Sequence, residues 1–118
     1  MKKIFAAAAV ALLSAGAAYA GGNVSVVDQA GFMNGQTTAQ WGRNNTAMTI
    51  QRDIGNSSFT GQIGRGNFAG TAQSGFGNTS VTGQFGAYNS AGTIQSGFGN
   101  VSSTSQVGVG NVSNTYQH

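Results

Sequence analysis

Polar and apolar positions alternate along most of the chain, in short stretches separated by glycine. Residues 67–73, for example, are Asn-Phe-Ala-Gly-Thr-Ala-Gln, with Asn, Ala, Thr and Gln on one parity and variable residues on the other. Four residues that include glycine then precede the next such stretch. This alternation, followed by a glycine-containing connection, is typical of a β-strand and a turn. An eleven-residue repeat can also support a helical coiled coil, but the recurring glycine and β-branched threonine disfavour it.

Four kinds of residue recur every eleven positions between residues 23 and 117. Threonine stands four residues after each asparagine except in the first unit, which has Val27, and glycine stands two residues after glutamine except at Asp53. Low-complexity sequence does not keep such register, so the pattern predicts an internal structural repeat. The asparagine and glutamine columns are Asn23, Gln29, Asn34, Gln40, Asn45, Gln51, Asn56, Gln62, Asn67, Gln73, Asn78, Gln84, Asn89, Gln95, Asn100, Gln106, Asn111 and Gln117. The glycine column is Gly31, Gly42, Gly64, Gly75, Gly86, Gly97 and Gly108.

A second period of 22 residues lies over the first. The position two residues after asparagine is alanine in alternate units, at Ala47, Ala69 and Ala91, and serine in the others, at Ser58, Ser80 and Ser102. Two strands and two turns for each 22 residues predict an all-β fold, a two-sheet β-solenoid of strand-turn-strand rungs. Residues i and i+22 then lie about 4.8 Å apart along the axis. Strands that begin at Asn23 and at every second asparagine fall on one sheet, and the others fall on the second sheet.

The face that carries asparagine, serine or alanine, threonine and glutamine is predicted to point inward. Stacked, desolvated amides require the same side chain at the same position in every rung, because each amide must find its hydrogen-bond partner there. We expect amide-to-amide ladders along the asparagine and glutamine columns. The other face, with residues such as Val24, Met48 and Phe59 among glycine and serine, is too irregular for such ladders. A simple rule of hydrophobic residues inside would have favoured that second face.

The turns are predicted to hold the glycine column, which supplies backbone angles with positive φ, and Asp53 is a residue type that tolerates the same region. Turn residues also form two mostly apolar columns, one at each side of the solenoid. We expect them to close the two sides of the core, with exposure for fibre bundling or surface adhesion as the alternative. The columns are Phe32, Ile54, Phe76 and Phe98 on one side and Trp41, Ile63, Phe85 and Val107 on the other.

Charge is scarce beyond residue 20, where three arginines stand against two aspartates. Asp28 is expected in the first strand and the other four charges in turns. Charges on an edge strand, or like charges one rung apart, hinder unwanted association. We interpret these residues as possible gatekeepers against aggregation, with ordinary solubility as the alternative; they are Asp28, Arg43, Arg52, Asp53 and Arg65.

The first twenty residues have the pattern of a secretory signal peptide. Met1-Lys2-Lys3 is a basic start, Ile4 to Leu13 is apolar, and Ala18-Tyr19-Ala20 has the small residues at which a signal peptidase cuts. The apolar run is shorter than the roughly 20 residues that span a bilayer, so stable membrane insertion is not expected. Domains are therefore predicted at 1–20, the signal peptide, and 21–118, the β-solenoid.

The residue types needed for catalysis are almost missing. The chain has one histidine, His118, no cysteine, no glutamate and two aspartates, so no nucleophile and base or paired carboxylates can be assembled. A metal site needs several ligands, and nucleic-acid binding needs a basic patch. We expect no enzyme activity, no cofactor, no metal and no nucleic-acid partner.

The repeat resembles the curlin repeat, Ser-x5-Gln-x-Gly-x2-Asn-x-Ala-x3-Gln. The similarity covers residues 34–117, after a half repeat at 23–33, and the four repeats span 34–118. This chain has asparagine where the family begins with serine, and Ser113 replaces alanine in the last repeat. Three repeats fit the Gln-Gly-Asn-Ala-Gln core, at Gln40, Gly42, Asn45, Ala47, Gln51; at Gln62, Gly64, Asn67, Ala69, Gln73; and at Gln84, Gly86, Asn89, Ala91, Gln95.

The resemblance implies a structural subunit of secreted curli-type amyloid fibres, which serve in adhesion and biofilm matrix. It implies export through a Sec signal and an outer-membrane export pore to the surface of a Gram-negative-type bacterium, and a nucleator subunit as partner beside the chain's own copies. The glycine-rich stretch that curlins carry before the repeats is reduced here to Gly21-Gly22. A minor nucleator subunit is one alternative, and a monomeric ice-binding or adhesin β-solenoid is another.

Overall fold

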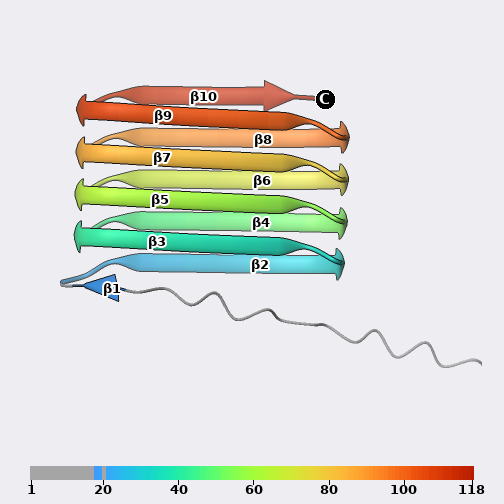
Figure 1. Cartoon of the computed structure of the whole chain (residues 1–118), viewed down its shortest axis with the longest axis horizontal. Helices are drawn as coiled ribbons and strands as arrows, with labels where there is room; N and C mark the ends of the chain where they lie inside the picture. Colours follow the sequence, from blue (N-terminus) through green and yellow to red (C-terminus); the bar gives the residue numbers. More distant parts are fainter. Residues whose placement is uncertain (1–17, 20) are drawn as a thin grey trace, which may run out of the picture.

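The computed structural model of the protein describes residues 18–19 and 21–118. The predicted signal peptide lies outside the described residues apart from Ala18 and Tyr19. The described residues form strands and short connections, and they include no helix long and apolar enough to cross a membrane. Consecutive strands from β2 to β10 run back and forth and rise one above another, as Figure 1 shows.

A two-residue strand is followed by nine longer strands, of which the first eight have nine residues each and the last has six. The strands are β1 (Ala18–Tyr19), β2 (Val24–Phe32), β3 (Gly35–Arg43), β4 (Thr46–Ile54), β5 (Ser57–Arg65), β6 (Phe68–Phe76), β7 (Thr79–Ala87), β8 (Ser90–Phe98), β9 (Val101–Val109) and β10 (Val112–Gln117).

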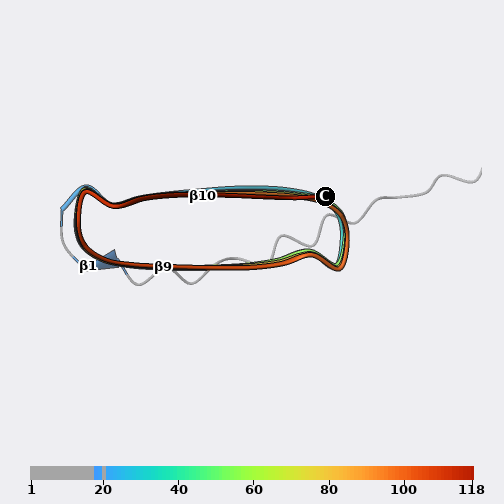
Figure 2. The ribbon, with the colours of Figure 1, turned by 90° about the horizontal axis from the view of Figure 1, so that it is seen from above.

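The strands form two parallel sheets. The odd sheet has the order β1-β3-β5-β7-β9 and the even sheet the order β2-β4-β6-β8-β10. Every full pairing joins residue i to residue i+22, such as Gln62 to Gln84 and Gln73 to Gln95. Seen along the axis, the rungs superpose as one flattened loop with a sheet on each long side (Figure 2). The predicted two-sheet β-solenoid of 22-residue rungs is confirmed.

The regular face of each strand points inward, as predicted. In β6 the buried residues are Ala69, Thr71 and Gln73, while Phe68 and the residues between them are more exposed. The only buried apolar side chains among the described residues are three alanines, and the largest fully buried side chains are glutamines and asparagines. Hydrogen bonding and tight packing of small polar groups therefore hold the two sheets together, with little help from a hydrophobic core.

The strands are longer than the sequence predicted. Each nine-residue strand begins after the asparagine and runs three residues past the glutamine, so only two residues connect consecutive strands. The seven glycines predicted in turns lie inside the strands instead. Their positive φ is confirmed at 104° to 129°, and Asp53 has φ 77°. A Cβ on Gly64 would lie 1.8 Å from the carbonyl oxygen of Gly86, so this column lets two rungs approach closely at a bend in the strand.

A second column with positive φ was missed by the sequence prediction. It is the residue just before each asparagine, which forms the corner between strands. Glycine fills most of these positions, but Met33, Asn44 and Tyr88 adopt φ between 56° and 58° there. Non-glycine residues seldom adopt this region. The corners at Asn44 and Tyr88 are tied to the preceding rung by hydrogen bonds, from Asn44 N–H to Gly21 O at 3.1 Å and from Tyr88 N–H to Arg65 O at 2.9 Å.

Candidate assembly interface

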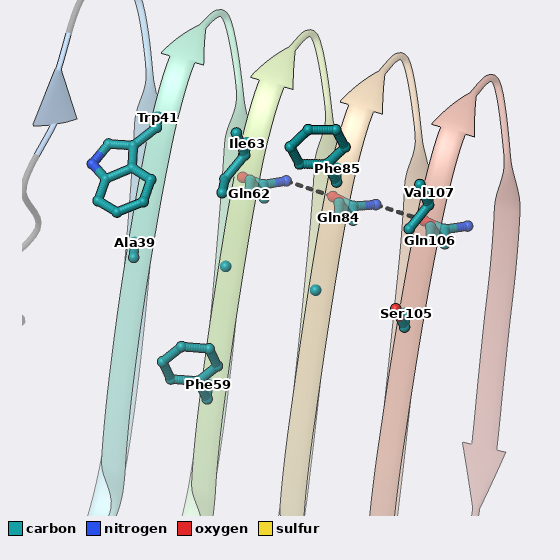
Figure 3. Close-up of a pocket in the computed structure, with 12 residues that line it drawn as sticks. Ala39, Trp41, Phe59, Gln62, Ile63, Gln84, Phe85, Ser105, Gln106 and Val107 are labelled. Carbon is teal, nitrogen blue, oxygen red and sulfur yellow. Dashed lines mark hydrogen bonds between the residues drawn. The ribbon is translucent and has the colours of Figure 1, made fainter.

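The glutamine column forms an uninterrupted amide ladder in each sheet. In the odd sheet, Gln62 Nε2 donates to Gln84 Oε1 at 2.8 Å, and Gln84 Nε2 donates to Gln106 Oε1 at 2.8 Å. Figure 3 shows these two bonds as dashed lines along the axis. From Gln40 to Gln117, each Nε2 also donates to a backbone carbonyl of the opposite sheet, as Gln62 does to Thr46 O at 3.0 Å. One buried side chain thus ties its rung to the next rung and one sheet to the other.

The asparagine column acts mainly on the backbone, where the sequence predicted amide-to-amide ladders. Asn67 Oδ1 accepts the N–H of Asn89 at 3.1 Å, and its Nδ2 donates to Gly86 O at 3.1 Å. Nδ2 also donates to Ile63 O, four residues earlier, at 3.4 Å. Bonds between two asparagine side chains occur only at Asn45 with Asn67 and Asn89 with Asn111 among the described residues. Asparagine therefore locks the corners, while glutamine connects the rungs.

The inward hydroxyl groups are less well satisfied than the amides. Six of these buried hydroxyl oxygens have no hydrogen-bond partner among the described residues, and the side-chain oxygen of Gln36 has none either. A buried polar atom without a partner lowers stability by roughly 1–3 kcal/mol. The six hydroxyls belong to Ser58, Ser80 and Ser102 of the odd sheet and to Thr49, Thr71 and Thr93 of the even sheet.

The two ends of the stack are open. β2 and β10 have no fully buried residue, whereas three residues of β6 are buried. Gln106 and Gln117 each donate to a carbonyl of the opposite sheet but to no further glutamine. At the other end, β1 covers part of the β3 edge, pairing Ala18 with Gln40 and Tyr19 with Trp41. The segment predicted to be cleaved therefore occupies a place on that edge.

One apolar column lies on the outer face of the odd sheet. The sequence pattern predicted that it would close the core, and it does not. Trp41 is 50% exposed and Phe85 57% exposed. A groove of about 430 Å³ runs beside this column, with small residues at its base (Figure 3). The column is Trp41, Ile63, Phe85 and Val107, and the small residues are Ala39, Gly61, Gly83 and Ser105.

The other apolar column, at the ends of the even-sheet strands, is also exposed. Its members stack in register, Phe32 on Ile54, Ile54 on Phe76, and Phe76 on Phe98. The rings of Phe76 and Phe98 have centroids 6.2 Å apart, a normal separation for interacting aromatic pairs. The expectation that these side chains close the core is wrong for both columns, because the inward amides and small residues already fill the narrow interior.

The five charged residues beyond residue 20 are exposed and all lie in strands. Asp28 lies in β2, as expected, but Arg43, Arg52, Asp53 and Arg65 were predicted in turns. Arg43 and Arg65 are register partners on adjacent rungs, so the like charges do stack. The Arg65 guanidinium lies 5.5 Å from the centre of the Tyr88 ring. Asp53 takes the glycine position, and its Oδ2 accepts the Gly75 N–H at 3.0 Å.

Within residues 18–19 and 21–118, no group of three or more histidine, cysteine, aspartate or glutamate side chains comes close enough to hold a metal ion. The features with the most regular geometry are the columns of inward amides and the open strand edges at the two ends of the stack. In sequence comparisons the chain matched no protein-family profile and no curated protein. The candidate functional site therefore rests on the geometry of the stack.

Proposed function

We propose that the protein is a structural subunit of an extracellular fibre that grows by end-to-end stacking of solenoids, with a role in adhesion and biofilm matrix. The observation that carries this proposal is the identity of the inward columns from rung to rung. The glutamine ladder ends at Gln106 and Gln117 with donors that the next rung would use, and β2 presents the same residues at the other end. Each end is thus a template for another copy.

The open ends also support polymerisation over a monomeric solenoid. Monomeric repeat proteins need terminal units with a polar outer face to stay soluble and single. Here the first and last full strands continue the glutamine column of the middle ones, at Gln29 and Gln117. The ice-binding alternative loses its main feature, because the threonine column points inward and Thr49, Thr60 and Thr82 are fully buried.

Secretion is part of the proposal and rests on the signal-peptide pattern of residues 1–20 together with the resemblance to curlin repeats. The exposed apolar columns suit lateral bundling of fibres or contact with a surface, since exposed apolar patches mark interaction sites. Stacked charges such as Arg43 and Arg65 would then limit the tightness of that association.

The test is to incubate purified residues 21–118 and examine the product by electron microscopy and fibre diffraction. We expect unbranched fibres with a meridional reflection at about 4.7–4.8 Å, the spacing between strands. We also expect an equatorial reflection at about 10 Å, the spacing between sheets. A chain that remains monomeric in analytical ultracentrifugation while keeping its β circular dichroism would contradict the proposal and favour the monomeric adhesin. Mass spectrometry of the secreted protein tests cleavage after Ala20.

A further inference from the structure

The two sheets contain different numbers of full-length strands. The even sheet begins with β2 and ends with β10, whereas the full strands of the odd sheet run from β3 to β9. Because strands rise alternately on the two sheets, the next position beyond β10 lies on the odd sheet, beside β9 (Figure 1). A copy that docks here must fill that position first.

We propose that successive copies are related by a half-turn about the stack axis, so that β2 of the incoming copy pairs with β9 and its β3 pairs with β10. The inference rests on the proposed function and specifies how one copy recognises the next. β2 and β9 run in opposite directions in one copy (Figure 1), and a half-turn makes them parallel. Stacking by translation alone would place the nearest odd-sheet strands about 9.6 Å apart, twice the spacing of paired strands, and would leave buried backbone groups unpaired.

The glutamine ladders continue across a half-turn junction. Inside the stack, Gln84 Nε2 donates both to Phe68 O and to Gln106 Oε1. Gln106 Nε2 donates to Ser90 O alone among the described residues. The half-turn puts Gln29 of the next copy beside Gln106, and Gln40 beside Gln117. The amide oxygens of the incoming pair then accept the bonds that the end donors lack.

The corner hydrogen bonds continue in the same way. Each inner asparagine accepts the N–H of the asparagine 22 residues later, as Asn78 does from Asn100 at 3.0 Å. At the end of the stack, the half-turn brings the N–H of the incoming Asn23 to Asn100 Oδ1. It likewise brings the N–H of the incoming Asn34 to Asn111 Oδ1. The asparagine and glutamine columns that end at β9 and β10 are thereby extended by residues of the same type, whereas Thr104 meets Val27 of the next copy.

The end strands depart from the repeat in a way that this arrangement accommodates. The position two residues after asparagine is serine in β5, β7 and β9 of the odd sheet and alanine in β4, β6 and β8 of the even sheet. β2 belongs to the even sheet but has Ser25 there. After a half-turn Ser25 lies on the odd sheet beside Ser102, so it continues the serine column and not the alanine column.

Gln36 and Ser113 form the second such pair. Gln36 stands in β3 at the position of the serine column, is 8% exposed, and has a side-chain oxygen without a partner among the described residues. Its Nε2 donates to Thr38 Oγ1. β10 has Ser113 where β4, β6 and β8 have alanine. The half-turn brings Ser113 of one copy beside Gln36 of the next, where the serine hydroxyl donates to the unpaired Gln36 oxygen. Translation would leave Gln36 without a paired strand on the side opposite Ser58.

Cysteine pairs at outward positions distinguish the two arrangements without disturbing the ladders. In the variant with Val26→Cys and Ser103→Cys, the two cysteines of successive copies are neighbours across a half-turn junction. In the variant with Val26→Cys and Asn114→Cys, they are neighbours across a translated junction. All three residues are exposed. Adjacent parallel strands bring the Cα atoms to about 4.8 Å, within the range for a disulfide. Val81→Cys with Ser103→Cys, register partners inside one copy, is the reactivity control.

Fibres are assembled under reducing conditions, oxidised, and separated by denaturing electrophoresis. We expect a ladder of covalent oligomers from the pair at 26 and 103, with at least ten times less crosslinking from the pair at 26 and 114. The opposite ratio, or a control pair that reacts while the pair at 26 and 103 does not, would overturn the half-turn. Failure to form any fibre would count against the proposed function itself. As a second measurement, Ser113→Ala and Gln36→Ala should each raise the critical concentration for growth several-fold, whereas the outward Asn114→Ala should leave it unchanged. Because the half-turn pairs Ser113 with Gln36, the double variant should be no worse than the poorer single variant; fully additive effects would also overturn the inference.

Discussion

The inward and outward columns of β5 differ in how far their residues vary from rung to rung. Gln62 points inward and is flanked by Gln40 and Gln84, whereas the next residue, Ile63, points outward and is flanked by Trp41 and Phe85. An inward amide must meet an amide in each neighbouring rung, because water cannot replace a missing partner there. An outward side chain needs only to fit the pleated surface. Side-chain pairing in the interior therefore dictates the repeat, and the outer surface is free to diversify.

The largest expected effect comes from breaking the close approach between rungs. Gly64→Ala would place a methyl group 1.8 Å from Gly86 O at a residue with φ 129°, and should lower the free energy of unfolding by at least about 4 kcal/mol. Gly83→Ala is the matched control, since nothing lies within 4 Å of its Cβ and removing backbone freedom stabilises by up to about 1 kcal/mol. Chemical denaturation followed by circular dichroism measures both. Similar losses at the two glycines would show that the contact does not matter.

The next effect tests the amide ladder against the outer column. Gln62→Ala removes the hydrogen bonds to Gln84 Oε1 and Thr46 O and the one from Gln40 Nε2, so it should lower the free energy of unfolding by about 3 kcal/mol. Ile63→Ala, one residue along, removes a side chain that is 40% exposed and should lower it by about 1 kcal/mol. Both losses are calculated from the midpoint and slope of a chemical denaturation curve followed by circular dichroism. If the order of the two losses is reversed, the outer apolar column holds the stack and the ladder does not.

A third prediction separates the ends of the glutamine ladder from its middle. Gln29→Ala and Gln117→Ala remove amides whose ladder hydrogen bonds are completed by another copy. They should therefore slow fibre elongation several-fold more than Gln73→Ala does. Gln73→Ala should instead lower the stability of the folded chain, because its amide bonds both Gln95 and Ser57 within one copy. Seeded growth followed by light scattering measures elongation. Equal rates for all three variants would argue that growth does not proceed through these ends.

The smallest effect distinguishes inward amides from inward hydroxyls. Thr71→Val replaces a buried hydroxyl that has no partner among the described residues with a methyl group of similar size. The free energy of unfolding should stay the same or rise by up to about 1 kcal/mol, because removing an unpaired buried polar atom relieves its desolvation. The control is Thr71→Ala, which also leaves a cavity and should be destabilising. A clear loss in the valine variant would indicate that an ordered water satisfies the hydroxyl.

The sequence by itself determined the period, the strand type and the inward face. The repeated columns identify residues i and i+22 as neighbours, and the identity of Gln62, Gln84 and Gln106 requires an interior in which each amide meets its copy. This information is local and repetitive, so tertiary context adds nothing to it. The positive φ of the glycine column also follows from the sequence, since few other residues adopt that backbone region.

Only the tertiary structure decided where each strand ends and which apolar residues stay exposed. Trp41 and Phe76 have the character of core residues, but the short inward side chains draw the two sheets together and leave no room for rings between them. The corner at Tyr88 carries positive φ because the hydrogen bonds from neighbouring rungs fix it, and no local sequence signal marks that strain. The unpaired Gln36 oxygen and the unequal ends of the two sheets likewise depend on what lies in the next rung, which a linear pattern does not reveal.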